Sequence, residues 1–371
     1  MAEPRKIVLI LGNGFDLDLG LKTSYKDFWE SEFCPKDYPA PLIHHLNQRW
    51  EDNLEAVKWY DLENELLNYY KGIPDPTVGA DCLTEEERSF LKDFTKYGHA
   101  CGWYNDRLEL VQSLVNKGVL YYDGNPLGRV GEHLKEDALQ SPIWRDRKAL
   151  KLIKEGLFKY ITSIDKPIPE SLTVAFHVLL SMIKSVKAGD MVDIYTFNYT
   201  RVQMREYRMD RIPVFHMHGS CEDGKIILGT RDGTPMVSEY DFLQKVMDDS
   251  FRPPDIPTAL DNADELIFFG HSLGENDRQY FEQFFTKQVG SDNQKEPYIF
   301  IFTRDSDSKV DIKRSLKSLT GDRLSLLYST NQPIIIRTGE LKEDQKLFFD
   351  FLVAHHTDRH YASEVIGKLI K

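Results

Sequence analysis

Lys6-Ile-Val-Leu-Ile-Leu11, followed directly by Gly12-Asn13-Gly14, is the stretch that decides the fold of this chain. A continuous apolar run of this kind is typical of a strand buried on both faces of a parallel sheet. Glycines directly after such a strand predict a tight turn into a helix. The chain therefore begins like an α/β domain, in which helices flank a parallel sheet.

Strand-like segments return only in the second half of the chain. They are short, β-branched or aromatic, and bounded by turn residues, and they occupy residues 191–198, 213–218, 225–228, 265–269, 298–302 and 333–337. Helical patterns separate them. This alternation predicts further parallel strands joined by helices.

The long stretch between the first strand and these segments shows helical spacing with many aromatic side chains. Thr84 and Glu87 have the spacing of a capping box, which marks the start of a helix. Another helix is predicted from Ser171 to about Lys187, and Gly189 is placed to end it.

Together these patterns predict a Rossmann-like α/β fold with a mostly parallel sheet. Residues 1–23 and 190–371 are expected to form the sheet domain, and residues 24–189 a large helical insertion after the first strand. The chain has 371 residues, more than a typical single domain, which agrees with this two-part organisation.

The composition argues against several classes of function. There are 47 lysine and arginine residues against 59 acidic residues, giving a net charge of −12, so nucleic-acid binding is not expected. No apolar run approaches the ~20 residues that span a bilayer. The first residues lead straight into a strand rather than an export signal. Widely spaced cysteines, without a pair that would hold zinc, indicate free thiols and no metal: Cys34, Cys82, Cys101 and Cys221. We therefore expect a cytoplasmic protein.

Asn198 and His218 stand at the ends of two predicted strands. Open α/β sheets bind ligands beyond the carboxyl ends of their strands, so this amide and this imidazole are expected to face one crevice. His218 precedes the flexible Gly219 and is expected to be exposed and to titrate near neutrality. An Asn at a strand end also commonly closes a turn through its own side chain. His216 is expected to be a packed or hydrogen-bonded core histidine.

The turn Gly12-Asn13-Gly14 could let phosphate oxygens approach backbone N–H groups at the start of a helix. The dinucleotide-binding fingerprint needs a further glycine at position 17, where this chain has Leu17. A two-glycine turn of this kind also occurs with no ligand. Thr23 and Ser24 are candidates either for ligand contact or for helix caps.

Gly270-His-Ser272-Leu-Gly274 follows an apolar strand and has the pattern of a hydrolase nucleophile elbow. In an esterase Ser272 would be the nucleophile, and the acid and base would come from a set of later residues: Asp305 or Asp307, and His355, His356 or His360. The alternative is a second ligand-binding strand end, with Gly270 and Ser272 near a ribose or phosphate and Asp277 capping the next helix.

The chain resembles the bacterial AbiH phage abortive-infection family. Its opening, Gly12-Asn-Gly-Phe-Asp-Leu-Asp-Leu-Gly-Leu-Lys-Thr-Ser-Tyr-Lys-Asp-Phe28, is similar to the family's opening signature. Later blocks resemble the family's in the same order: Trp59-Tyr-Asp-Leu-Glu63, Thr196-Phe-Asn-Tyr-Thr200, His218-Gly-Ser220 and Gly270-His-Ser-Leu-Gly-Glu-Asn-Asp277. The resemblance extends from residue 6 to about residue 285.

That family is in turn similar to the sirtuin-like NAD hydrolases of antiviral defence. In those enzymes a strand-end Asn and a His flank the nicotinamide ribose, and by resemblance Asn198 and His218 take those places. This implies a sirtuin-like version of the Rossmann-like fold. Sirtuins have Gly-Ala-Gly where this chain has Gly12-Asn13-Gly14, and the cysteine pairs of the sirtuin deacetylase zinc module are absent. Protein deacetylation is therefore not expected.

The resemblance implies hydrolysis of NAD to nicotinamide and ADP-ribose as part of phage defence. Asn198 would hold a water or a ribose hydroxyl in line, and His218 would accept its proton. NAD would be the substrate, with no metal. The residues expected to contact it are Gly12, Asn13, Gly14, Phe15, Asp16, Thr23, Glu63, Tyr199, Gly219, Gly270, Ser272 and Asp277. Asp16 and Glu63 would contact the ribose or stabilise its cation; the alternative is that Asp16 caps a helix and Glu63 lies on a solvated helix face. The helical insertion would exclude water.

Such an activity must be held in check until infection, so we expect control by self-assembly or by a partner protein of the defence system. Two other functions stay open at this point. One is the Ser272 esterase. The other is a noncatalytic module that binds a nucleotide and acts as a sensor or scaffold.

Overall fold

The computed structural model describes residues 3–53, 61–72, 84–97, 107–116, 121–122, 139–140, 142–238, 240–290, 295–356 and 358–371. Trp59, Cys82 and Cys101 lie outside this part of the chain. The chain divides into two compact units. The first comprises residues 1–33, 157–233 and 244–371, and the second comprises residues 34–156 and 234–243.

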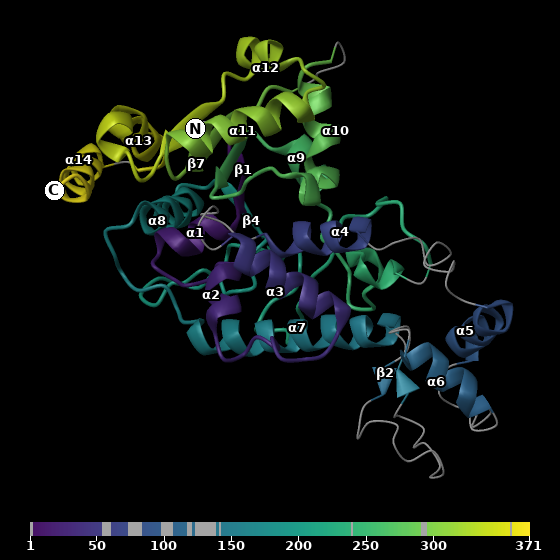
Figure 1. Ribbon diagram of the computed structural model, residues 1–371. Helices are drawn as coiled ribbons and strands as arrows, with labels where there is room; N and C mark the ends of the chain where they lie inside the picture. The colour runs from purple at the N-terminus through teal and green to yellow at the C-terminus, as the bar shows by residue number, and fades with distance from the viewer. Residues whose placement is uncertain are drawn as a thin grey trace. The chain divides into compact units, whose positions relative to one another are not determined.

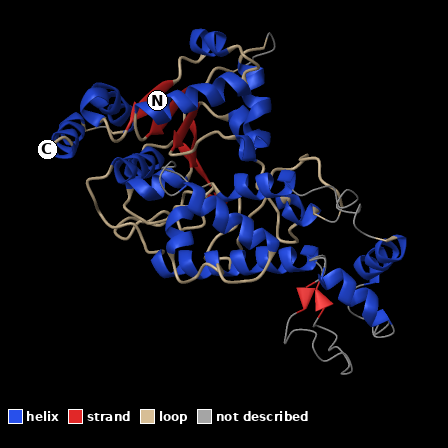
Figure 2. Ribbon diagram, in the orientation of Figure 1, coloured by secondary structure: helices blue, strands red, loops and turns tan. Residues whose placement is uncertain are grey.

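The first unit is built on a six-stranded sheet, shown as red arrows in Figure 2. Its strands are β1 (Lys6–Leu11), β4 (Met191–Thr196), β5 (Val214–His216), β6 (Glu265–Phe269), β7 (Tyr298–Thr303) and β8 (Ile334–Arg337). They lie in the order β5-β4-β1-β6-β7-β8, and every neighbouring pair is parallel. The predicted fold class is confirmed. This is also the strand order of doubly wound dinucleotide-binding folds.

Helices cover both faces of this sheet (Figure 1). Because alternate residues of a strand point to opposite faces, Ile7 and Leu9 of β1 enter one core cluster and Val8 and Ile10 the other. The first face is covered by α1 (Asn13–Asp18), α8 (Val174–Lys187), α13 (Leu341–His355) and α14 (Arg359–Leu369). The second is covered by α9 (Ile256–Asn262), α10 (Arg278–Gln288), α11 (Ser306–Leu319) and α12 (Leu324–Thr330). The strands are thus buried on both sides, as their apolar runs predict.

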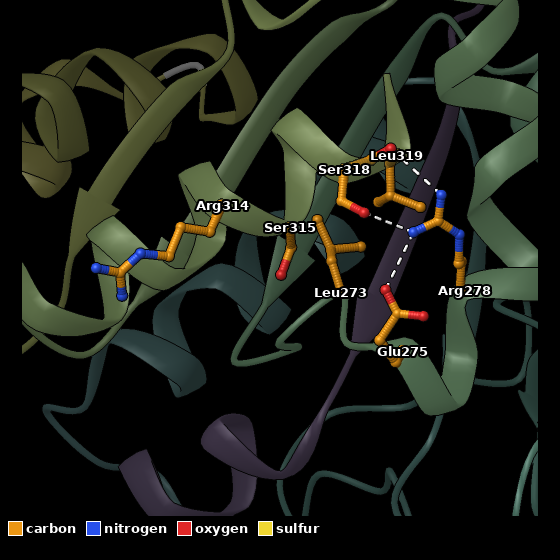
Figure 3. Close-up of a pocket in the computed structure, with 7 residues that line it drawn as sticks. All are labelled: Leu273, Glu275, Arg278, Arg314, Ser315, Ser318 and Leu319. Atoms are coloured by element: carbon orange, nitrogen blue, oxygen red, sulfur yellow. Dashed lines mark hydrogen bonds and ion pairs between the residues drawn. The ribbon is translucent and has the colours of Figure 1, made fainter. Parts of the chain in front are cut away.

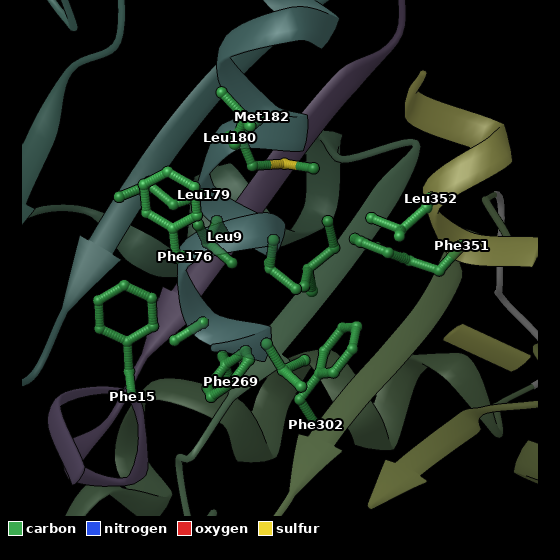
Figure 4. Close-up of a cluster of buried hydrophobic side chains, with 14 of the residues drawn as sticks. Leu9, Phe15, Phe176, Leu179, Leu180, Met182, Phe269, Phe302, Phe351 and Leu352 are labelled. Atoms are coloured by element: carbon green, nitrogen blue, oxygen red, sulfur yellow. The ribbon is translucent and has the colours of Figure 1, made fainter. Parts of the chain in front are cut away.

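The helix predicted from Ser171 begins slightly later. It is α8, which starts at Val174 because the Thr173 hydroxyl accepts a hydrogen bond from Phe176 N, the pattern of an N-cap. Gly189 follows the helix with a φ of +103°, as predicted for a helix end. Figure 4 shows Phe176, Leu179 and Met182 of α8 in the apolar cluster with Phe15 and Phe269.

The strand predicted at residues 225–228 does not form. The segment has no strand structure, although Ile226, Ile227 and Leu228 are buried. Ile227 N donates to His218 O at 2.9 Å, but the segment pairs with no neighbouring strand. Its apolar pattern thus reflects burial of a loop rather than membership of the sheet.

The second unit is mainly helical. Its elements are α3 (Pro41–Asn53), α4 (Leu62–Gly72), α5 (Glu85–Tyr97), α6 (Leu108–Asn116), most of α7 (Pro142–Ile164), the antiparallel pair β2 (Tyr121–Tyr122) and β3 (Leu139–Gln140), and η4 (Asp241–Leu243). The capping box is confirmed, because Thr84 N donates to Glu87 Oε2 and Glu87 N donates to Thr84 Oγ1. Helices α2 (Tyr25–Glu30) and α8 belong to the unit with the sheet, so this unit is shorter than residues 24–189.

No helix among the described residues is both long enough and apolar enough to cross a membrane.

Candidate functional site

The carboxyl ends of β4, β1 and β6 lie side by side at the centre of the sheet. Thr196 pairs with Leu11, and Leu11 pairs with Phe269. In chain order, β4 and β5 extend the sheet on one side of β1, and β6, β7 and β8 extend it on the other side. The point between β1 and β6 is therefore the topological switch point of the sheet. Open α/β sheets bind ligands outside the carboxyl ends of their strands at such a point. The residues just beyond these ends are therefore the candidate site.

The glycines beyond β1 and β6 pack directly on each other. A Cβ atom at Gly14 would lie 2.6 Å from Gly270 Cα, and one at Gly12 would lie 2.5 Å from His271 Cα. Gly12 N donates to Phe269 O and Gly14 N donates to Gly270 O. The two N–H groups that we expected to face a phosphate are already bonded within the protein. These glycines are thus required by the close approach of two turns.

Asn198 is buried and takes part in a first set of hydrogen bonds. Its Nδ2 donates to Gly12 O at 3.1 Å, and its amide helps to stabilise the charged form of the Asp16 carboxyl group. Thr200 Oγ1 donates to Asp16 Oδ2 at 2.7 Å. We call Gly12, Asp16, Asn198 and Thr200 the Asp16 set. It brings together the strand ends of β1 and β4, as the sequence predicts for Asn198 and Gly12.

Asp16 has no cation partner among the described residues. Burial raises the pKa of its carboxyl group to about 7, and the hydrogen bonds from Thr200 and Asn198 offset this only in part. A carboxyl group with such a pKa changes its charge near neutral pH. Perturbed groups of this kind at a strand-end crevice are typical of functional sites.

His218 belongs to a second set of buried polar groups. Its Nε2 lies 3.3 Å from Lys245 Nζ and 3.4 Å from Asp277 Oδ1. Lys245 Nζ also lies 3.4 Å from Asp277 Oδ1, and His271 Nε2 lies 3.4 Å from Asp277 Oδ2. We call His218, Lys245, His271 and Asp277 the Lys245 set. Lys245 comes from the short helix η5 (Lys245–Met247), and Asp277 ends η6 (Glu275–Asp277).

The expectation that His218 is exposed and titrates near neutrality is wrong. Its side chain is buried, and burial, followed by the charge of Lys245, lowers the pKa of the imidazole to about 3. Burial alone would raise the pKa of Asp277, but Lys245 and His271 hold it well below its usual value. At neutral pH the set therefore contains a neutral His218 and an ionised Asp277.

The tautomer of His218 follows from its neighbour. An ammonium group has only donors, so Lys245 Nζ donates to His218 Nε2, and the proton of the neutral ring is then on Nδ1. The free lone pair that a general base needs is directed at Lys245. In this arrangement Nδ1 can donate a hydrogen bond, and the role of His218 as proton acceptor stays a prediction.

Asn198 and His218 thus reach the same edge of the sheet in different hydrogen-bond sets. Among the described residues no hydrogen bond joins their side chains. The ring of Phe197 lies edge-on to His218, with centroids 5.3 Å apart, and 4.3 Å from the ring of His271. His216 Nδ1 bonds to Asn198 O at 3.1 Å, which confirms the predicted hydrogen bond, although the side chain is half-buried rather than in the core.

Several residues that we expected to contact a ligand have partners within the protein. Phe15 is buried against Phe269 with ring centroids 5.5 Å apart. Thr23 Oγ1 donates to Asn13 Oδ1 at 2.6 Å, and Ser24 caps α2 by accepting from Asp27 N. These contacts order the chain after the glycine turn.

The same holds for the residues that follow β4 and β5. Tyr199 OH donates to Ile227 O at 3.1 Å. Gly219 has a φ of +79°, and a Cβ there would lie 2.4 Å from Lys225 O. Glu63 is buried in α4, in the second compact unit.

Asp277 occupies the N-cap position of α10, but its side chain makes no capping hydrogen bond. The predicted cap is wrong because the carboxylate turns to His271 and to Lys245, whose ammonium group offers it charge as well as a hydrogen bond.

The esterase arrangement is not assembled. Ser272 is exposed. A nucleophile elbow requires the serine to lie at the strained position of the turn, but in residues 270–274 the positive φ angles are those of Gly270 and Leu273. His355 Nε2 lies 2.7 Å from Glu265 Oε1. Glu265 is at the amino end of β6, and the length of the strand, about 17 Å, separates it from the end that leads to the serine.

The other expected partners are also engaged elsewhere. His356 bonds to Ser181, and Asp305 caps α11 by accepting from Ser308 N. The remaining two, Asp307 and His360, are exposed.

A small cavity of about 230 Å³ lies beyond Ser272 (Figure 3). Its lining consists of Leu273, Glu275, Arg278, Arg314, Ser315, Ser318 and Leu319. Arg278 donates to Glu275 and to Ser318. In Figure 3 the side chain of Arg314 points away from the cavity. The cavity is smaller than the ~300 Å³ at which small-molecule sites begin, so it is not a dinucleotide site by itself.

Sequence reasoning missed Thr200, Lys245 and His271. Thr200 lies four residues after β4 and His271 two residues after β6, and closeness to a strand end is a signal that would have found them. Lys245 lies in irregular backbone, and no local pattern marks it. Among the described residues no group of His, Cys, Asp and Glu side chains is arranged to hold a metal ion. Cys34 and Cys221, the cysteines in the described part, are free thiols.

Fold and site define a doubly wound, parallel α/β protein with buried ionisable groups at its topological switch point. The sequence adds the family. Residues 8–295 match the model of the family described as "Bacteriophage abortive infection AbiH", and the chain belongs to that family. It is therefore an abortive-infection protein of phage defence. No curated protein matches the chain.

Proposed function

We propose that this protein defends its host by hydrolysing NAD to nicotinamide and ADP-ribose after infection. The observation that supports this best is the Asp16 set at the switch point between β1 and β6, where folds with this strand order bind dinucleotides. The choice of NAD rests on the similarity of the family to sirtuin-like NAD hydrolases, which stays a prediction.

In this reaction water adds to C1′ of the nicotinamide ribose, and the bond from C1′ to the nicotinamide nitrogen breaks. Nicotinamide leaves as a neutral molecule, and one proton is released for each NAD. The transition state resembles an oxocarbenium ion, as in other glycosidic cleavages. Such a cation is stabilised by a nearby carboxylate, and ionised Asp16 would supply it.

Asn198 would hold a ribose hydroxyl or the attacking water. The amide is held by Gly12 O, so it is already oriented before a ligand arrives. His218 would contribute a hydrogen bond from Nδ1 rather than accept the proton, because Lys245 is directed at its Nε2. Self-assembly or a partner protein would keep the site inactive before infection.

The test is to measure NAD in bacteria that express the chain, before and after phage challenge, with nicotinamide and ADP-ribose as products. Asn198→Ala should abolish NAD loss, and His218→Ala should reduce it about 10- to 1,000-fold. Matched controls are Asn262→Ala and His360→Ala, exposed residues with no part in either set. If NAD stays constant in challenged cells that carry the unaltered chain, the hydrolase is refuted.

One observation favours a second function, a noncatalytic nucleotide sensor. His218 Nε2, a nitrogen that the predicted base would use, lies 3.3 Å from Lys245 Nζ. A sensor would bind NAD or ADP-ribose in a titration with the purified chain and leave NAD intact in challenged cells. The same two measurements therefore separate the two functions.

A further inference from the structure

Two buried histidines at the switch point, His218 and His271, have ring nitrogens that accept hydrogen bonds from groups that can only donate. His271 Nδ1 accepts from Leu273 N at 3.0 Å, and a backbone N–H has no acceptor capacity. The ring proton of His271 is therefore on Nε2, which lies 3.4 Å from Asp277 Oδ2. His271 thus directs an N–H group at the Asp277 carboxylate.

His218 has the opposite arrangement, because the group beside its Nε2 is an ammonium group. Lys245 Nζ lies 3.3 Å from His218 Nε2. The same Nζ lies 3.4 Å from Asp277 Oδ1, and this carboxylate stabilises the ammonium form of Lys245. An ammonium group has donors only, so His218 Nε2 accepts and the ring proton is on Nδ1.

The Nδ1–H group of His218 is a donor that no residue in the described part of the chain uses. The side chain is buried, with 5% of the residue exposed, and its printed hydrogen bond is the one to Lys245 at Nε2. The ring of Phe197 packs edge-on to the imidazole, with centroids 5.3 Å apart, and holds it in place. A buried N–H group without an acceptor costs free energy, so this donor is suited to meet a ligand.

We propose that Lys245 is a positioning residue, whose ammonium group holds His218 with Nδ1–H available to an oxygen acceptor of the ligand. This inference rests on the proposed nucleotide site and adds which atoms that site recognises. Suitable acceptors are a phosphate oxygen or the carboxamide oxygen of nicotinamide. Without Lys245, Asp277 Oδ1 would be the group beside His218 Nε2, at 3.4 Å. That nitrogen would then donate to the carboxylate, and Nδ1 would become an acceptor.

The position of the ring proton can be measured in the unaltered chain labelled with ¹⁵N-histidine, because a ring nitrogen with a proton resonates far from one without. The signals of the two histidines are identified by their loss in His218→Gln and His271→Gln. At neutral pH the proton of His218 should be on Nδ1 and that of His271 on Nε2. A His218 ring with its proton on Nε2, or with protons on both nitrogens, overturns the proposal.

Variants test whether Lys245 fixes this tautomer. At pH ~8.5, where a free histidine is neutral, Lys245→Met should move the His218 proton to Nε2. Asp277→Asn should leave it on Nδ1, because Lys245 remains. Lys287→Met is the matched control, since Lys287 forms an exposed ion pair with Asp261. It should leave the tautomer of His218 unchanged.

These variants separate positioning from support of the fold. A lysine that served only the fold would alter stability without exchanging the tautomer of His218, so a proton that stays on Nδ1 in Lys245→Met contradicts the proposal. A proton that moves to Nε2 in Asp277→Asn contradicts it as well. The unaltered chain and Asp277→Asn keep the test valid if Lys245→Met fails to fold.

Ligand addition separates this role from the nucleotide site itself. Nicotinamide presents the carboxamide oxygen, and ADP-ribose presents the phosphate oxygens. At least one of them should shift the Nδ1–H signal of His218, and Lys245→Met should bind that ligand about 5- to 100-fold more weakly. The expected tautomers with no response to either ligand support the role of Lys245 and refute the nucleotide site. A response to ligand with the His218 proton on Nε2 supports the nucleotide site and overturns the role of Lys245.

Discussion

At the scale of single residues, Asp16 carries a carboxyl group that folding removes from water, and no described residue gives it a cation. Its pKa is raised from 3.8 to about 7, so the folded chain binds this proton more tightly than the unfolded chain does. The stability that results is present at low pH and is lost as the pH rises from about 4 through about 7. Above pH ~7 the ionised carboxylate costs up to ~4 kcal/mol.

We therefore predict that Asp16→Asn stabilises the protein above neutral pH while it impairs the site. The free energy of unfolding should rise by about 2–4 kcal/mol at pH ~8.5 and change by less than ~1 kcal/mol at pH ~4. Urea unfolding at both values measures this, with the exposed Asp350→Asn as control. An Asp16→Asn variant that is less stable at both pH values would show that the carboxylate serves the fold.

Lys245 gives a second prediction at this scale. It is fully buried, and its ammonium group is directed at both His218 and Asp277. Lys245→Met leaves the Asp277 charge buried without this cation, which should lower the free energy of unfolding by about 3–5 kcal/mol. Adding Asp277→Asn should recover a large part of the loss.

The control for Lys245 is Lys287→Met, because Lys287 forms an exposed ion pair with Asp261. That change should cost less than ~1 kcal/mol. Equal losses in the two lysine variants would contradict the assignment of a buried, coupled pair, and double-mutant unfolding experiments decide the matter.

At the scale of elements, the turn after β6 depends on a glycine for two reasons at once. Gly270 has a φ of +63°, and a Cβ there would lie 2.4 Å from Gly14 Cα. Gly20 has a φ of +79°, but nothing lies within 4 Å of its Cβ position. Gly270→Ala should therefore destabilise the chain by more than ~3 kcal/mol, and Gly20→Ala by only ~1 kcal/mol. Thermal unfolding of the two variants separates the steric clash from the backbone strain, and similar values would argue against a tight contact between the turns.

The elements show which patterns can be read from sequence. The strands β1, β4, β6 and β7 and the helix α8 were predictable because uninterrupted apolar runs and helical spacing reflect burial along a whole element. The prediction of a strand at residues 225–228 was wrong because a buried loop produces the same apolar run as a strand. Only the partners of its backbone N–H groups distinguish the two cases.

At the scale of the whole molecule, acid should unfold the protein through its buried histidines. Burial lowers the pKa of His177 and His356 to about 4 and that of His218 to about 3. As the pH falls below about 6.5, these side chains take up protons in the unfolded chain but not in the folded one. Stability is thus present above that pH and is lost between about pH 6.5 and about pH 4.

His177→Leu tests this loss, because both ring nitrogens of His177 are buried and have no hydrogen-bond partner in the described part of the chain. Relative to its effect at pH ~8, the substitution should add about 2 kcal/mol to the free energy of unfolding at pH ~5. The exposed His360→Leu should show no such difference. A His177→Leu effect that is equal at both pH values would refute the mechanism.

The site was predictable only as far as strand ends reveal it. Gly12, Asn198 and Gly270 follow strands and do meet at one edge, because parallel strands bring their carboxyl ends together. The burial of His218 and the presence of Lys245 depend on side chains from distant segments, which no local pattern reports. The resemblance to the family predicted the phage-defence function, but it did not predict the side-chain contacts of the site.

The strand order has a consequence for how the chain is made. Lys6 of β1 pairs with Met191 on one side, and Ile7 pairs with Glu265 on the other. At about 5–20 residues per second, a ribosome needs roughly 10–40 s after making β1 before its first neighbour emerges. For that time the most apolar strand of the sheet has both hydrogen-bonding edges unpaired, a state prone to aggregation. Efficient synthesis of this protein should therefore depend on a chaperone that shields its first dozen residues until β4 leaves the ribosome.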